Sequence, residues 1–192
     1  MKKLLGMAII LTLFLSGIGC SGLYQGAPKR GTVTDGVYTN DFFKLSFTIP
    51  EGWSVYSDQE FYENFNVSLP TDENLANTKM GFTDAYIYKT AEPKNRIGIT
   101  YYIGMDDDLT DEQIKNRLLL NVSDVEFGDI EFIKIGEADY AMISGPSSDG
   151  TMNYYYIWSK EECGYLRPVI DIHLNSDDSV YNYLDNFAQI AN

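Results

Sequence analysis

Residues 37–53 read VYTNDFFKLSFTIPEGW, and this stretch decides the fold. Its apolar side chains recur at every second position: Phe43, Leu45, Phe47 and Ile49. Period-two alternation is typical of a β-strand that buries one face, and Pro50 and Gly52 then end the run. The stretch therefore predicts one or two β-strands at the start of a folded domain.

Helix starts are marked by capping boxes, in which a hydroxyl residue and a Glu or Gln three positions later satisfy each other's backbone N–H groups. Ser57 and Glu60 open a short helix, and Thr110 and Gln113 open a second one. The second helix carries its apolar face at Ile114, Leu118 and Val122. A third helix is expected after Ser176, because an apolar stripe recurs at Val180, Leu184, Phe187 and Ala191.

Strand-like segments fill most of the remaining chain. Residues 82–90 and 96–104 predict a hairpin that turns at 91–95, and four more segments follow at 130–136, 139–145, 152–159 and 165–174. Consecutive strands joined by short turns form an antiparallel sheet, and the helices must bury their apolar faces against it. We therefore predict an α+β fold, with an antiparallel β-sheet flanked by helices.

The opening motif YTNDFFKLSFTIPEGWSV, with its Pro-x-Gly-Trp stop at residues 50–53, resembles the start of PsbP-like domains. The order of elements over residues 37–192 is similar as well. The resemblance implies an α/β/α sandwich, a fold shared by photosystem-associated PsbP proteins and a Ran-binding nuclear import factor. It also implies a binding or assembly role rather than catalysis. No binding residue of the family maps onto this chain.

The N-terminus is expected to export and anchor the domain. Residues 1–19 combine a basic start, an uncharged apolar run and a small-residue exit, which is the layout of a secretory signal. With Gly19 before Cys20, the segment resembles a bacterial lipoprotein signal, and the resemblance implies a lipid on Cys20. Two or more acyl chains hold a protein firmly on a bilayer, so the predicted location is the extracytoplasmic face of the cell membrane. Residues 20–36 are glycine-rich and predict a flexible linker.

The chain is strongly acidic, with 14 Lys and Arg against 28 Asp and Glu. Two of the basic residues precede Cys20, so the mature chain carries a net charge of −16. Nucleic acid is therefore not an expected partner, since its recognition depends on basic surfaces. The charge suits cationic partners or a divalent metal, and it equally suits solubility alone.

Candidate catalytic and metal-binding residues are few. His173 is the sole histidine, and on a strand it shares a face with Asp171, so the two form a candidate general base or simply a solvent-facing pair. The acidic loop at residues 106–112 offers carboxylates to calcium, although acids at a helix start are favoured without any metal. Cys163 lies in an expected hairpin turn beside two glutamates, where a reactive thiolate is disfavoured. No cofactor is predicted.

Tyrosine is unusually frequent, with 15 in the chain. Within residues 152–159, one strand face carries Tyr154, Tyr156 and Trp158, which form either a packed sheet surface or a binding surface. The prediction is a lipid-anchored, non-enzymatic domain that binds a protein or small molecule. The alternative is a metal-dependent or hydrolytic enzyme that uses His173 and Asp171 or the acidic loop from Asp106 to Glu112.

Overall fold

The computed structural model describes residues 28–66, 68–69, 71, 81–161 and 166–190, which form two antiparallel β-sheets and a few short helices. The larger sheet has seven strands in the order β4-β5-β6-β10-β9-β8-β7. In chain order these are β4 (Trp53–Val55), β5 (Phe82–Lys89), β6 (Glu92–Ile103), β7 (Glu131–Ile135), β8 (Ala138–Pro146), β9 (Met152–Ser159) and β10 (Leu166–Asn175). The smaller sheet has the order β1-β2-β3-β11, built from β1 (Thr32–Thr34), β2 (Val37–Asn40), β3 (Leu45–Thr48) and β11 (Phe187–Gln189).

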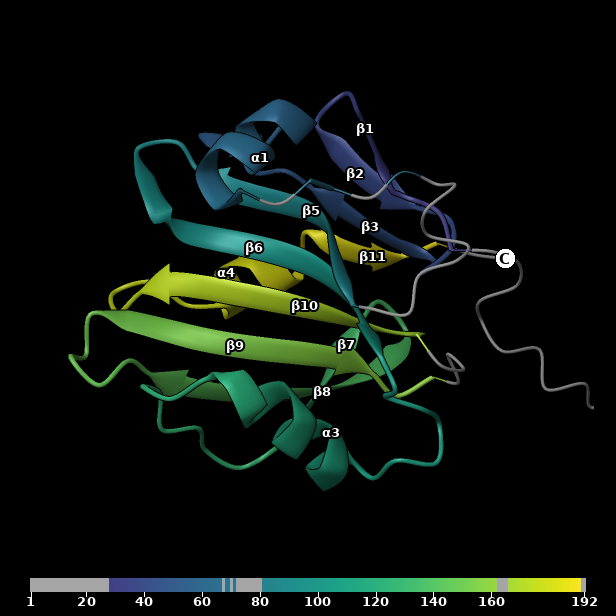
Figure 1. The fold of residues 1–192 in the computed structure, drawn as a ribbon, viewed down its shortest axis with the longest axis vertical. Helices are drawn as coiled ribbons and strands as arrows, with labels where there is room; N and C mark the ends of the chain where they lie inside the picture. Colours follow the sequence, from purple (N-terminus) through teal and green to yellow (C-terminus); the bar gives the residue numbers. More distant parts are fainter. Residues whose placement is uncertain (1–27, 67, 70, 72–80, 162–165, 191–192) are drawn as a thin grey trace, which may run out of the picture.

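The small sheet covers one face of the large sheet, and the main core lies between them (Figure 1). The alternating residues of the opening motif supply Phe43, Leu45 and Phe47, each at most 2% exposed. They pack against isoleucines of β5, β6, β9 and β10: Ile87, Ile97, Ile99, Ile157, Ile170 and Ile172. We call this buried side of the large sheet the inner face.

Helices lie on both sides of the large sheet. On the outer face, α1 (Asp58–Phe65) lies over β5, and α3 (Asp111–Leu118) lies over β8 and β9 (Figure 1). Both predicted capping boxes are present, one at Ser57 and one at Thr110. A 3-10 turn, η1 (Leu119–Asn121), ends the second helix earlier than predicted. The α+β prediction of an antiparallel sheet flanked by helices is confirmed.

The C-terminal helix was predicted too long. Only α4 (Tyr181–Leu184) is helical, and β11 follows it. Phe187 pairs with Phe47 across the small sheet, with ring centroids 4.3 Å apart, so sheet pairing outweighs the helical periodicity of this segment. Val180 and Phe187 are buried as the stripe predicted, whereas Ala191 lies outside the described residues.

The folded domain also begins earlier than the predicted linker end at residue 36. Strand β1 pairs with β2 through a two-residue turn at Asp35 and Gly36, which have φ angles of 50° and 76°. Asp-Gly at a two-residue hairpin is a strong turn signal, because both positions require positive φ. Gly36 is therefore a turn residue of the folded domain.

Residues before β1 are fixed by a buried carboxylate. The backbone N–H of Gly31 donates to Asp84 at 2.9 Å, and the Lys29 carbonyl accepts from the Tyr101 hydroxyl at 2.9 Å. We call residues 29–31 with Asp84 the N-terminal latch. Within the described part of the chain, no helix is long and apolar enough to cross a membrane.

Candidate functional site

The candidate site is the part of the outer face that neither α1 nor α3 covers. Figure 1 looks onto it, with β6, β10 and β9 running between the two helices. We call it the open face. Because side chains alternate along a strand, it is built from every second residue of these strands and of β5: Tyr86, Arg96, Gly98, Thr100, Tyr154, Tyr156, Asp171 and His173.

The strand register arranges these residues in rows across the sheet. One row joins Arg96 of β6, His173 of β10 and Tyr154 of β9. The next joins Tyr86, Gly98, Asp171 and Tyr156. Polar and aromatic side chains thus occupy the middle of an otherwise apolar sheet.

His173 and Asp171 lie together, as their strand spacing predicted. Nε2 of His173 is 2.6 Å from Oδ1 of Asp171, but the two atoms do not meet in hydrogen-bonding geometry. The prediction of a solvent-facing pair is wrong for one of the two residues. The His173 side chain is only 8% exposed, whereas the Asp171 side chain is 24% exposed. Tyr154 covers the imidazole, with ring centroids 4.2 Å apart, which explains its burial.

Arg96 is the cation of the open face. Its guanidinium lies over the Tyr86 ring at 5.5 Å from the centroid. Its Nε is buried and has no hydrogen-bond partner among the described residues. A cation held by a ring and not by a carboxylate keeps its donors available to a ligand.

The negative charge of Asp171 acts on three tyrosine side chains of the open face. Burial raises the pKa of Tyr102 to about 12, and the negative charge of Asp171 contributes. Burial also raises the pKa values of Tyr86 and Tyr156 well above the usual value, with the same carboxylate adding to the rise and Arg96 opposing it. All three hydroxyls are therefore protonated near neutral pH and can donate hydrogen bonds.

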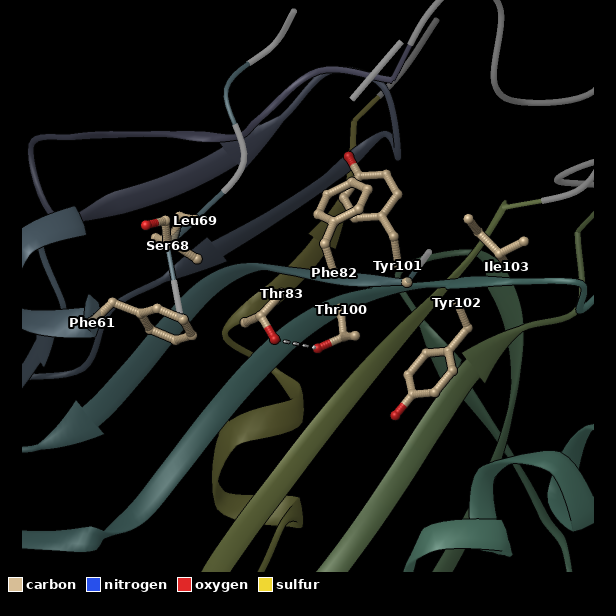
Figure 2. A pocket seen from close by; sticks show the side chains of 10 residues that line it. Phe61, Ser68, Leu69, Phe82, Thr83, Thr100, Tyr101, Tyr102 and Ile103 are labelled. Atoms are coloured by element: carbon tan, nitrogen blue, oxygen red, sulfur yellow. Dashed lines mark hydrogen bonds between the residues drawn. The ribbon is translucent and has the colours of Figure 1, made fainter. Parts of the chain in front are cut away.

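Two cavities adjoin the open face, one at each end. A polar cavity of about 390 Å³ lies where Arg96, Tyr154 and His173 meet Lys94 and the β8–β9 turn at residues 147–151. A more apolar cavity of about 520 Å³ lies at the other end (Figure 2). Its outer-face lining includes Phe61, Thr83, Thr100 and Tyr102, and the Thr83 and Thr100 hydroxyl oxygens are 3.4 Å apart (Figure 2).

The predicted tyrosine–tryptophan surface is only partly at this site. Trp158 is fully buried beneath α3, and its indole N–H donates to Asp111 at 3.1 Å. It is a core residue, so its place in a binding surface is wrong. Tyr156 is 7% exposed and forms the border of the covered region, while Tyr154 is half-buried within the open face.

The acidic loop serves the fold in this structure. Asp111 pairs with Lys160 and Trp158, and Asp107 pairs with the buried Arg167 at 3.3 Å. Across the described residues, no cluster of three or more His, Cys, Asp or Glu side chains is arranged to hold a metal ion. Cys20 and Cys163 lie outside the described residues.

Sequence reasoning missed Arg96, Gly98 and Tyr86. The segment from Arg96 to Tyr102 alternates strictly, with Ile97, Ile99 and Tyr101 on the inner face, so a period-two reading could have separated Arg96 and Gly98 from the core. Their position beside Asp171 depends on the β6–β10 register, which joins segments about 75 residues apart and has no local signal.

Comparisons with known proteins identify the fold. Neither a scan of protein-family models nor a search of curated protein sequences gave a match. Among solved structures, the solution structure of cyanobacterial PsbP (CyanoP) from Synechocystis sp. PCC 6803 is similar, with a TM-score of 0.51 and 12% identity. The similarity covers 80% of this chain and 91% of that one. The domain therefore has a PsbP-like fold.

A crystal structure from Bacteroides thetaiotaomicron VPI-5482 is similar at a lower level, with a TM-score of 0.40 and 13% identity. That similarity covers 85% of this chain and 49% of the other.

Proposed function

We propose that this chain is a lipid-anchored, extracytoplasmic, non-enzymatic module that holds a ligand on its open face. The observation that carries the binding role is the charge arrangement there. Arg96 and Asp171 lie on adjacent strands, on a part of the sheet that neither α1 nor α3 covers, yet they form no ion pair with each other. Partly buried charges without full partners are costly to a fold, and sites of this kind are found where a ligand supplies the missing interactions.

The anchoring role is supported by residues 1–19 and by Cys20, which follow the layout of a lipoprotein signal. Its test is mass spectrometry of the exported full chain beside a Cys20→Ser variant. We expect the wild-type N-terminal peptide to begin at Cys20 with an acylated sulfur, and the variant to be released into the medium. An unmodified Cys20 thiol in membrane-free material would overturn the anchor.

The binding role is tested by native mass spectrometry of the full chain, purified in detergent from membranes. A Cβ at Gly98 would lie 3.7 Å from Asp171, in ordinary contact, so Gly98→Val adds methyl groups to the open face beside Asp171. Gly128→Ala is the matched control, since its Cβ would lie 3.7 Å from the Ser144 carbonyl, away from this face. We expect a bound species in the wild type and in Gly128→Ala that Gly98→Val lacks. Equal, ligand-free spectra from all three would contradict the binding role.

A hydrolytic enzyme is the second candidate, favoured by the 2.6 Å approach of His173 to Asp171. A carboxylate beside a histidine can orient the imidazole as a general base. The rate of hydrolysis of chromogenic esters and peptides, measured for the wild type and for His173→Gln, distinguishes the enzyme from the binding module. Turnover that disappears only in the histidine variant would favour the enzyme over the binding module.

A further inference from the structure

The open face presents two opposite charges that each need a partner. Asp171 lies beside His173, with 2.6 Å between Oδ1 and Nε2 but no hydrogen-bonding geometry. The Arg96 guanidinium lies over the Tyr86 ring. Nε of Arg96 and Oδ1 of Asp171 have no hydrogen bond within the described part of the chain, and the two residues form no ion pair with each other.

The separation of the two charges is set by the register. Asp171 lies opposite Gly98 and Arg96 lies opposite His173, so the two side chains are diagonal neighbours on one sheet face. Diagonal residue positions on adjacent strands are about 7–8 Å apart. A small ligand that carries a cation and an anion close together can therefore contact both side chains through charge-assisted hydrogen bonds.

Resting on the proposed binding function, we infer that the open face binds a small zwitterion, a free α-amino acid, with its ammonium on Asp171 and its carboxylate on Arg96. Tyr86 and Tyr156 lie in the same row of the sheet as Asp171, so their side chains border the ammonium end. The polar cavity next to Arg96 receives the carboxylate end; it is lined by Arg96, Lys94 and Ser148 and also by Asp124 and Asp149, so the two cations must outweigh two carboxylates there. A small ligand is fixed by a few convergent polar groups on an aromatic lining, which is the arrangement found here.

Net charge separates a zwitterion from other small ligands. The chain carries −14 overall, so a simple anion is repelled at long range even though Arg96 attracts it locally. A simple cation would satisfy Asp171 and leave Arg96 without a counter-charge. A neutral polyol would fill hydrogen bonds but leave both charges uncompensated, and an α-amino acid satisfies both without adding net charge.

The test is isothermal titration calorimetry of the detergent-solubilised full chain with each of the twenty standard L-amino acids. We expect at least one to bind, and we expect its methyl ester and its N-acetyl derivative to bind at least 10-fold more weakly. Arg96→Gln and Asp171→Asn should each weaken binding at least 10-fold. Lys134→Gln, which removes a cation of β7 that pairs with Asp139, should leave affinity unchanged.

An α-amino acid needs both Arg96 and Asp171, and this requirement distinguishes it from other ligands. If Arg96→Gln weakens the amino acid and its ester equally, the guanidinium does not hold the carboxylate and the inference is wrong. Binding of glucose in place of any amino acid would overturn it in favour of a polyol. If no amino acid binds while Gly98→Val still removes a co-purified species, the zwitterion fails and the binding function stands. If that species is absent too, both fail.

Discussion

Removing the Asp84 carboxylate should release residues 29–31 from the domain and destabilise the fold. Oδ2 of Asp84 accepts from the Gly31 N–H, the Tyr38 hydroxyl and the Asn40 amide, and the side chain is fully buried. Asn40 Nδ2 keeps two other acceptors, the Tyr101 hydroxyl and a backbone carbonyl. Asp84→Ala therefore leaves two donors without this acceptor, the buried Tyr38 hydroxyl and the partly buried Gly31 N–H.

Each orphaned buried donor costs about 1–3 kcal/mol, which sums to about 2–6 kcal/mol. Burial of the carboxylate is itself unfavourable and raises the pKa of Asp84, so part of this cost is recovered when the charge is removed. We expect a net loss of about 2–4 kcal/mol in the free energy of unfolding. For a domain of this size that lowers Tm by about 5–15 °C.

The assay is urea denaturation of the full chain, with hydrogen exchange at the Gly31 amide as a local readout. Asp58→Ala is the matched control, because Asp58 binds the same N-terminal segment through Arg30 at 3.0 Å but is 69% exposed. An exposed pair of that kind contributes about 0–1 kcal/mol. If Asp84→Ala costs no more than Asp58→Ala and Gly31 exchange is unchanged, the latch is not a determinant of stability and the reasoning is wrong.

Three further outcomes are expected. Burial raises the pKa of Asp84 above 3.8 in the folded state, so ionisation of this carboxyl weakens the fold as pH rises through the raised pKa. The stability of the wild type minus that of Asp84→Asn should therefore fall as pH rises above 3.8 in parallel denaturation series. Arg167→Ala should lower the unfolding free energy by about 3–5 kcal/mol in urea, since its buried guanidinium donates to the Met105 and Ser159 carbonyls. Trp158→Phe should cost about 1–3 kcal/mol by thermal denaturation, because the indole N–H bond to Asp111 and part of the packing beneath α3 are lost.

Local signals in the sequence predicted the elements well. Both capping boxes and most strands of the large sheet follow from residue patterns within a window of about ten residues. The failures have a common physical cause. At Phe187 a helical stripe gave way to pairing with Phe47, and at Trp158 an apparent surface aromatic lies under a helix that begins about 50 residues earlier. Tertiary packing overrides local propensity in both places.

The candidate site was less predictable than the fold, because its parts come from four strands. The pairing of His173 with Asp171 depends on two positions in one strand and was found from the sequence. Arg96 joins them only through the β6–β10 register, and the two cavities depend on where α1 and α3 lie. The sequence alone does not show that Arg96 lacks a carboxylate partner, because that depends on which residues the folded sheet places beside it.

The N-terminal latch limits how far the domain can lie from a lipid on Cys20. The Lys29 carbonyl is held by Tyr101, whose side chain belongs to the inner-face core, so the chain leaves the domain on the side of the small sheet. Only residues 21–28 then separate Cys20 from the fixed backbone, a reach of at most about 30 Å at 3.3–3.6 Å per residue. The open face lies on the opposite side of the seven-stranded sheet. A lipid on Cys20 would therefore hold the Lys29 backbone within about 30 Å of the bilayer.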